Sequence, residues 1–262
     1  MSIPVIMRAL QQASLNGPQD LSMITDATVP TPGPGQVLVK VTAAGVNIAD
    51  LSQARGTFRG GPQPPYLAGF EATGEVVALG EGVTNIGLGA EVIGVGYGAF
   101  AEYMVLAAAA AMPIPSGWTG EQALGLPVNL PTAVAVLKPL GQLAAGQAVL
   151  IHAAAGATGQ AAVKIAKHYG AVVIGTASPE KHEVVRSLGA DHVLDSRSDD
   201  LATQVLALTG GEGADLVIES VGGDTFGASL AATRRVTGRV VVTGLPAGMA
   251  SLSNWDLVYE HQ

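Results

Sequence analysis

The stretch from Ala148 to Tyr169 constrains the fold of this chain more than any other. A short apolar run, Ala148 to Ile151, is followed by small residues that include Gly156 and Gly159. Apolar residues then recur at helical spacing as far as Ala166, so we predict a strand, a tight turn and a helix. Glycines at such a turn allow a ligand to approach the backbone closely. The N-terminus of the following helix is a favourable place for a pyrophosphate.

The turn departs from the usual G-x-G-x-x-G pattern, because Ala154 stands at the first glycine position. The pattern alone is a weak signal, but the strand before it and the helix after it are the context that a dinucleotide site requires. The sequence therefore predicts a bound dinucleotide at this turn. The residues expected to contact it there are Gly156, Ala157, Thr158 and Gly159.

Composition excludes several classes of protein. The chain has 262 residues, of which 48% are hydrophobic and 13% are charged, with 35 glycines, as in a packed α/β protein with many turns. The net charge of −8 and the absence of a basic patch argue against nucleic-acid and anionic-membrane partners. No apolar run reaches about 18 residues, and the start lacks the features of a signal peptide. Cysteine is absent, so a disulfide, a thiolate metal site and a cysteine nucleophile are excluded. We expect a cytoplasmic protein.

Two kinds of pattern divide the chain near residue 125. The first part predicts short strands separated by glycine-rich turns, which suit a small, partly open barrel. A helix interrupted by Pro127 and Pro131 is expected at 121–135. From residue 147 onward, strands and helices alternate, which predicts a parallel, doubly wound sheet. The expected strands are 36–41, 73–79, 90–95, 100–106, 148–152, 171–176, 191–194, 214–219 and 238–243, and the expected later helices are 158–169, 179–188, 199–208 and 224–233.

Five segments together carry a family resemblance. They are Ala-Gly-Val-Asn-Ile-Ala-Asp at 44–50, Gly-Phe-Glu-Ala-Thr-Gly at 69–74, Gly-Ala-Phe-Ala-Glu-Tyr at 98–103, the glycine turn at 153–159, and Glu-Ser-Val-Gly-Gly at 219–223. With these segments in this order, the chain resembles the zinc-free quinone oxidoreductase branch of the medium-chain dehydrogenase/reductase superfamily. The resemblance implies an α/β protein with a GroES-like β-barrel domain, 1–125, and a Rossmann NAD(P)-binding domain, 126–262. Family members usually run about 60 residues further, add a sixth strand and form homodimers.

The residues at the family's zinc positions do not suit a metal. Zinc-dependent relatives carry a cysteine near the position of Asn47 and a histidine where Phe70 precedes Glu71. Zinc needs three or four ligands in a fixed geometry, and a single carboxylate cannot supply them. We therefore predict no metal site, and interpret Glu71 as a structural hydrogen-bond acceptor. No pair among the five histidines has metal-ligand spacing on one helix face, and His152 is expected to be packed at the end of its strand.

The resemblance also implies the catalytic residues. Asn47 and Asp50 would line the catalytic site, with Ile48 and Ser52 close to the nicotinamide. A hydride would pass to an electrophilic carbon conjugated to a carbonyl, while the protein orients the reactants and polarises the carbonyl oxygen. Asn and Asp just past a strand also serve as helix caps, so both roles stay open. The same resemblance assigns further cofactor contacts to Thr132, Ser220, Val221 and Gly244, and Thr132 is alternatively a residue of a helix interior.

One departure from related reductases concerns the proton donor. These enzymes often carry a tyrosine in a Gly-x-Tyr segment, which can donate a proton or a hydrogen bond. The segment here is Gly56-Thr57-Phe58, and a phenyl ring can do neither. This substitution counts against an enoyl-thioester reductase and leaves proton delivery to water or to another group.

The end of the second Rossmann strand favours NADPH over NADH. NAD enzymes usually place an acidic residue about 20 residues after the glycine turn, where it binds the ribose 2′-hydroxyl. The strand here ends at Ser178 without a carboxylate, and Ser178 and Lys181 suit a 2′-phosphate by hydrogen bond and charge. Ser196, after the third strand, aligns with a phosphate-binding tyrosine of some relatives. Glu180 could hold a ribose, although its place in a first helical turn also offsets the helix dipole.

The leading interpretation is an NADPH-dependent, zinc-independent oxidoreductase that reduces a small-molecule quinone or another α,β-unsaturated carbonyl. The alternatives are an enoyl-thioester reductase of fatty-acid or polyketide synthesis and a non-catalytic dinucleotide-binding protein. A last expectation concerns the fifth Rossmann strand, 239–243, which would be an exposed edge that invites self-association. A helix at 253–261, folded back over that edge, is the alternative.

Overall fold

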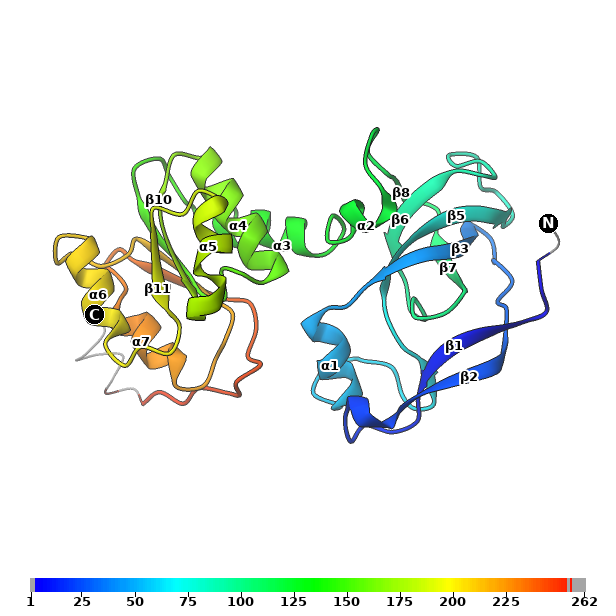
Figure 1. Ribbon diagram of the computed structural model, residues 1–262, viewed down its shortest axis with the longest axis horizontal. Helices are drawn as coiled ribbons and strands as arrows, with labels where there is room; N and C mark the ends of the chain where they lie inside the picture. The colour runs from blue at the N-terminus through cyan, green and yellow to red at the C-terminus, as the bar shows by residue number, and fades with distance from the viewer. Residues whose placement is uncertain (1–2, 254, 256–262) are drawn as a thin grey trace. The chain divides into compact units, whose positions relative to one another are not determined.

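The polypeptide forms two compact units, Met1–Val128 and Asn129–Gln262, in the computed structural model (Figure 1). The structure describes residues 3–253 and residue 255. Within these residues, no helix is both long and apolar enough to cross a membrane.

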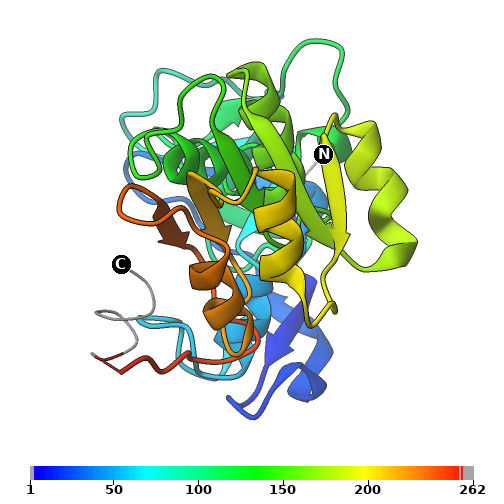
Figure 2. The same ribbon diagram turned by 90° about the vertical axis from the view of Figure 1, so that its left-hand side faces the viewer.

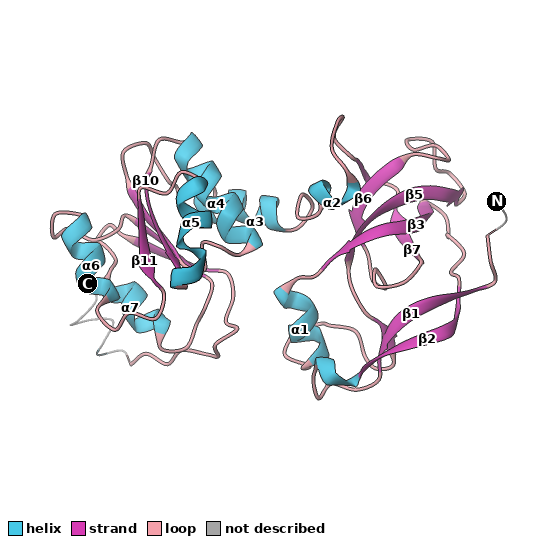
Figure 3. Ribbon diagram, in the orientation of Figure 1, coloured by secondary structure: helices cyan, strands magenta, loops and turns pink. Residues whose placement is uncertain are grey.

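The first unit is built from two antiparallel sheets, drawn in magenta in Figure 3. One sheet has the strand order β7-β3-β5-β6-β8 and the other has the order β2-β1-β4. The strands are β1 (Ile6–Gln12), β2 (Leu21–Thr28), β3 (Gln36–Gly45), β4 (Tyr66–Leu67), β5 (Glu71–Leu79), β6 (Glu91–Val95), β7 (Tyr103–Ala107) and β8 (Met112–Pro113). A 3-10 turn (Pro18–Asp20) and the helices α1 (Ile48–Ala54) and α2 (Gly120–Ala123) complete this unit.

Strand β3 separates two apolar clusters of the first unit. Val37 and Val39 are buried in one cluster, together with residues of β5, β6 and β7. Leu38 points to the opposite face and is buried in a second cluster with Met7 of β1. This arrangement follows from the alternation of side chains along a strand. The central position of β3 fixes the place of the segment that follows it, which carries Asn47.

The second unit contains a five-stranded parallel sheet in the order β11-β10-β9-β12-β13. Its strands are β9 (Ala148–Ile151), β10 (Val172–Ala177), β11 (His192–Asp195), β12 (Leu216–Glu219) and β13 (Arg239–Val242). Its helices are α3 (Asn129–Leu137), α4 (Ala157–His168), α5 (His182–Ser187), α6 (Leu201–Leu208) and α7 (Thr225–Ala231), with a 3-10 turn at Pro179–Lys181. This order, with crossover helices between the strands, confirms the doubly wound sheet.

Both faces of this sheet are covered, so its strands are apolar on both sides. Val149 and Ile151 of β9 pack with α3 and α4 on one face. Leu150 packs on the other face against residues of α6 and α7, which lie in front of the sheet in Figure 2, in yellow and orange. The chain passes from each strand into its helix at the carboxyl edge of the sheet, where the candidate site lies.

Several predicted elements differ from those observed. The single helix expected at 121–135 is two helices, α2 and α3, because the chain around Pro127 leaves the helical path. Pro131 is tolerated because it lies in the first turn of α3. The strand expected at 100–106 begins only at Tyr103, since Gly98, with φ of 83°, belongs to a turn that bonds to Gly69.

Other expectations were incomplete or fall outside the described residues. The strands β1 and β2 and the helix α1 were not predicted from the sequence. The segment expected at 179–188 is a 3-10 turn followed by the short helix α5. Of the helix considered at 253–261, only Ser253 and Trp255 lie within the described residues. Among the described residues, β13 pairs only with β12 and forms one edge of the sheet.

Candidate functional site

The glycine turn joins β9 to α4, and its two glycines have different surroundings. Gly156 is the N-cap residue of α4, with φ of −77° and ψ of 164°. A Cβ atom built on Gly156 would have one neighbour within 4 Å, the carbonyl oxygen of Ala153 at 3.2 Å. A Cβ atom on Gly159 would lie 2.3 Å from that same oxygen and 2.7 Å from Cα of Ala154. Gly159 therefore allows the helix to pack on the turn, whereas Gly156 leaves room for a ligand.

Ala154, at the first glycine position of the pattern, is accommodated by the neighbouring strand. Its side chain is buried, and its amide donates to the carbonyl oxygen of Thr176 on β10, at 2.9 Å. A Cβ atom built on Gly175 would lie 3.0 Å from Cβ of Ala154. The methyl group of Ala154 thus occupies space that the absence of a side chain at Gly175 leaves free.

A pocket of about 380 Å³ opens at the carboxyl ends of β9, β10, β11 and β12. This size is typical of small-molecule sites. Five of the residues assigned to the cofactor from the sequence line it, namely Gly156, Ser178, Lys181, Ser196 and Val221. The remaining lining residues are His152, Ala153, Ala155, Thr176, Ala177, Arg197 and Thr225. The pocket thus combines the glycine turn with the polar ends of two further strands.

The rim of this pocket carries two cations beside one carboxylate. The guanidinium of Arg197 lies 3.6 Å from the carboxylate of Glu180, and both side chains are exposed. A hydrogen bond from the hydroxyl of Ser178 lowers the pKa of Glu180, and the charges of Arg197 and Lys181 lower it further. Sequence reasoning missed Arg197. Its signal was its place directly after Ser196 at the end of a parallel strand, where ligands of such sheets bind.

The other cofactor positions of the second unit are not among the residues that line this pocket. Thr158 donates its hydroxyl hydrogen to Oδ1 of Asn129, at 2.7 Å, which ties the first turn of α4 to α3. Ser220 donates to the carbonyl oxygen of His152, at 3.2 Å. The remaining positions are Ala157 and Gly159 in α4, Thr132 inside α3, and Gly244 after β13. None of these six residues lines the pocket.

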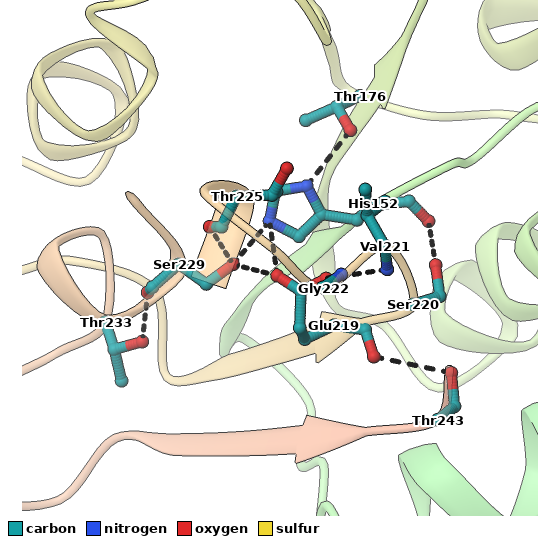
Figure 4. A network of polar contacts seen from close by, with 10 residues as sticks. All are labelled: His152, Thr176, Glu219, Ser220, Val221, Gly222, Thr225, Ser229, Thr233 and Thr243. Carbon is teal, nitrogen blue, oxygen red and sulfur yellow. Dashed lines mark hydrogen bonds and ion pairs between the residues drawn. The ribbon is translucent and has the colours of Figure 1, made fainter. Parts of the chain in front are cut away.

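A buried polar network lies beside the pocket (Figure 4). His152, at the end of β9, is buried, as expected from the sequence. Its Nδ1 atom is 3.3 Å from the hydroxyl oxygen of Thr176, and its Nε2 atom is 2.9 Å from that of Ser229. The hydroxyl of Ser229 also bonds to the carboxylate of Glu219. Burial lowers the pKa of His152, and the nearby charge of Glu219 opposes part of that effect.

In the first unit, Asn47 and Asp50 form the start of helix α1. Asn47 is the N-cap residue, and its amide donates to Oδ2 of Asp50, at 2.7 Å. Nδ2 of Asn47 donates to Oε2 of Glu71, at 2.8 Å. The other oxygen of Glu71 accepts from the amide of Gly125, at 2.6 Å. Glu71 is 1% exposed, and it is the hydrogen-bond acceptor expected from the sequence.

The carboxyl group of Asp50 has an unusual environment. Its Oδ1 atom is buried without a hydrogen-bond partner among the described residues. Burial raises the pKa of Asp50, and the charge of Glu71 raises it further. The pKa of Tyr66 is also raised, mainly by burial and to a smaller extent by the charge of Asp50. Asp50 therefore binds a proton more readily than an ordinary surface aspartate does.

The two neighbours of Asn47 in the chain are apolar and exposed. Val46 is 76% exposed and Ile48 is 58% exposed, on either side of Asn47 in the chain. Ser52 lies one helical turn after Ile48 and donates to its carbonyl oxygen, at 3.2 Å. The carboxamide of Asn47 is thus held by the buried Glu71, while the residues before and after it expose apolar side chains.

The residues at the family's zinc position do not fit the metal. Phe70 offers no ligand atom, and both oxygens of Glu71 already accept hydrogen bonds from Asn47 and Gly125. The structure, over residues 3–253 and 255, contains no cluster of three or more His, Cys, Asp or Glu side chains that could hold an ion. No catalytic step is therefore assigned to zinc.

Comparison with known proteins identifies the family. Residues 33–116 match the alcohol dehydrogenase GroES-like domain, and residues 157–262 match the zinc-binding dehydrogenase family. A probable quinone oxidoreductase of Leishmania amazonensis is 39% identical over 248 residues, which are 93% of this chain and 72% of that protein. The chain belongs to the zinc-free quinone oxidoreductase branch of the medium-chain dehydrogenase/reductase superfamily. It is thus an oxidoreductase with a GroES-like domain and a Rossmann domain, as predicted.

Two solved structures resemble this member of the quinone oxidoreductase branch in fold and sequence. A mycobacterial protein solved in complex with NADPH is 34% identical, with a TM-score of 0.88 over 95% of this chain and 77% of that one. The enoyl reductase CurK is 31% identical, with a TM-score of 0.86 over 98% of this chain and 78% of that one.

Proposed function

We propose that this protein uses NADPH to reduce a quinone or another α,β-unsaturated carbonyl, without zinc. The observation that carries the proposal is the basic rim of the dinucleotide pocket, formed by Ser178, Lys181, Ser196 and Arg197. Two cations and two hydroxyls suit the 2′-phosphate that distinguishes NADPH from NADH. The NADPH complex of the mycobacterial relative supports the same cofactor.

The second unit provides the groups that would hold the dinucleotide. The open space at Gly156 lies at the N-terminus of the 12-residue helix α4, where backbone amides and the helix dipole favour a pyrophosphate. Lys181 and Arg197 would bind the 2′-phosphate, and Glu180 would then give up its ion pair with Arg197. Bound NADPH supplies a hydride from its nicotinamide ring.

The first unit provides the groups that would face the substrate. Glu71 holds the carboxamide of Asn47, and the exposed side chains of Val46 and Ile48, on either side of Asn47 in the chain, are apolar. A flat, apolar ring with a carbonyl oxygen matches one polar group set among apolar ones. Asp50, whose pKa is raised by burial, is our candidate for the group that holds the proton in place of the tyrosine that Phe58 replaces.

An enoyl-thioester reductase is the second candidate. The similarity to the enoyl reductase CurK favours it, whereas Phe58, in the Gly-x-Tyr segment, counts against it.

The experiment measures the rate at which the full chain catalyses the oxidation of NADPH or of NADH, followed at 340 nm. A quinone, an enone and an enoyl thioester are supplied as substrates in parallel. We expect NADPH to be oxidised by the quinone or the enone, with equal rates before and after treatment with a chelator. A preference for NADH would contradict the cofactor assignment. Exclusive use of the enoyl thioester would select the second candidate. Loss of activity on chelation, restored by zinc, would contradict the metal-free mechanism.

A further inference from the structure

Four polar side chains lie in the interior of the second unit, where apolar packing is the rule. His152 is 2% exposed, and Thr176, Glu219 and Ser229 are fully buried. They come from β9, β10, β12 and α7, and their side chains point toward one another (Figure 4). Burying a carboxylate is costly unless hydrogen bonds replace its water. The network therefore has to satisfy Glu219, and the way it does so determines the shape of the adjoining turn.

Glu219 binds the turn that follows its own strand. One carboxylate oxygen, Oε1, accepts from the amide of Val221 at 2.7 Å and from the amide of Gly222 at 3.0 Å. The turn requires glycine at position 222, because Gly222 has φ of 79° and a Cβ atom there would lie 2.4 Å from the carbonyl oxygen of Gly248. The backbone also ties the turn to the segment that follows β13, since the amide of Gly223 donates to the carbonyl oxygen of Gly248, at 2.9 Å, and the amide of Ala247 donates to that of Val221, at 2.9 Å. Glu219 thus fixes the position of Val221, which lines the dinucleotide pocket.

The other carboxylate oxygen sets the direction of the remaining hydrogen bonds. The hydroxyl of Ser229 donates to Oε2 of Glu219. The oxygen of Ser229 then accepts from Nε2 of His152, at 2.9 Å. Since burial keeps His152 neutral, its Nδ1 atom carries no hydrogen and accepts from Thr176, at 3.3 Å. The geometry assigns His152 to the tautomer with hydrogen on Nε2.

The network links lining residues of the pocket through side chains that do not themselves line it. His152 and Thr176 line one wall, and Val221 lines another, whereas Glu219 and Ser229 are not among the lining residues. We infer that Glu219 is a positioning residue, which holds the Val221–Gly222 turn in the conformation that receives the dinucleotide. The inference rests on the proposed function only in that the pocket binds a dinucleotide.

A positioning role for Glu219 predicts how its loss should change the affinity for the two cofactors. Glu219 acts through the backbone of the turn and not through the basic rim, so its loss should weaken NADPH and NADH by the same factor. A change in the rim, such as Arg197→Ala, should weaken NADPH alone. The two kinds of variant therefore separate positioning of the turn from recognition of the 2′-phosphate.

The test compares two replacements of Glu219 in the full chain. Glu219→Leu removes both acceptor oxygens, and Glu219→Gln retains one oxygen for the amides of Val221 and Gly222. In the glutamine variant the new amide group donates to Ser229, whose hydroxyl hydrogen can turn to the carbonyl oxygen of Thr225, at 3.0 Å. We expect Glu219→Leu to raise the Kd of both cofactors about tenfold or more, and Glu219→Gln to stay within about threefold of the unaltered protein. Values of kcat at saturating cofactor should stay nearly constant.

Three results would overturn the inference. The first is a folded Glu219→Leu variant with unchanged Kd values, and the second is a loss confined to one cofactor. If the leucine variant does not fold, amide hydrogen exchange of the unaltered protein decides the matter. We expect the amides of Val221 and Gly222 to be protected like those of β12, and rapid exchange there would be the third contrary result. Failure of the unaltered protein to bind either cofactor would instead refute the proposed function.

Discussion

A comparison of Gly156→Ala with Gly159→Ala tests whether the glycine turn binds the dinucleotide. The two glycines are three residues apart, yet their surroundings differ sharply. At Gly156, a new methyl group would meet only the oxygen of Ala153, at 3.2 Å, in a backbone conformation that any residue can adopt. At Gly159, it would lie 2.3 Å and 2.7 Å from backbone atoms, which cannot rotate away as a side chain can.

The magnitudes follow from these distances. Gly156→Ala should change the free energy of unfolding by less than about 1 kcal/mol, because the restriction of the unfolded chain offsets the replacement of a good N-cap residue by a poor one. Gly159→Ala should gain about 1 kcal/mol of helix propensity but lose about 1–3 kcal/mol to overpacking. Since the clash involves backbone on both sides, we expect the upper part of that range and a net loss of about 1–2 kcal/mol.

For cofactor binding, we expect Gly156→Ala to be the more damaging of the two substitutions. The side chain added at Gly156 occupies the space where backbone and pyrophosphate meet, so Gly156→Ala should weaken NADPH and NADH at least tenfold, and Gly156→Val should abolish binding. Urea denaturation measures stability, titration calorimetry measures Kd, and circular dichroism checks that each variant is folded. A Gly156→Ala protein with unchanged Kd values would show that the dinucleotide binds elsewhere. A Gly156→Ala protein less stable than Gly159→Ala would refute the packing argument.

Three further predictions concern the rim of the pocket, the carboxyl group of Asp50 in helix α1 and the sheet edge. Lys181→Ala and Arg197→Ala should each weaken NADPH by about 1–2 kcal/mol and leave NADH nearly unchanged, as measured by calorimetry; equal losses for both cofactors would contradict the assignment of the 2′-phosphate. Burial raises the pKa of Asp50 in the folded state above its unfolded value, so its stabilising contribution is present at low pH and is lost as the pH rises through the raised pKa. Asp50→Asn should therefore raise the melting temperature at pH 7 but not near pH 3.5, and a gain that is equal at both pH values would count against this reasoning. The exposed edge strand Arg239–Val242 should lead the 262-residue polypeptide to self-associate, and a monodisperse monomer in light scattering would show that the edge is protected.

The sequence predicted the parts of the fold that depend on local patterns. The run Ala148–Ile151, the two glycines and the helical spacing after them appear together as β9, the turn and α4. The alternation of strands and helices that follows is regular enough to indicate the whole parallel sheet. Each of these signals lies within about one or two elements of the chain, where periodicity and turn residues determine the backbone conformation.

Elements with irregular patterns escaped prediction. Strand β1 has burial that alternates from Ile6 to Ala9, but its residue types do not follow it, because Ile6 is apolar and exposed whereas Gln12 is polar and buried. Helix α1 has only seven residues, too few for a clear helical period. The sequence left two roles open for Asn47, a position in the catalytic site implied by the family resemblance and a helix cap. The structure shows Asn47 as the N-cap of α1.

The polar contacts of the site could not be predicted because they join distant parts of the chain. Ser229 and His152 are 77 residues apart, and Asn47 and Glu71 are 24 apart. Arg197 lines the pocket because β11 pairs beside β10, and the only hint of this in the sequence is its place directly after Ser196. The sequence thus indicated the glycine turn and part of the pocket lining, whereas the polar network beside the pocket required the three-dimensional arrangement.

The contact between Ala154 and Gly175 bears on how dinucleotide sites of this kind are recognised. The methyl group that the first position of the turn carries is matched by a missing side chain on the next strand, at a separation that leaves room for only one of the two. Gly175 leaves space for Cγ1 of Val185 as well, which would lie 2.8 Å from a Cβ atom built there, and with glycine on this strand the turn accommodates alanine at its first position. A search that demands glycine at the first position would overlook chains of this type. Scoring both positions as a pair, with one small side chain permitted between them, would recover them.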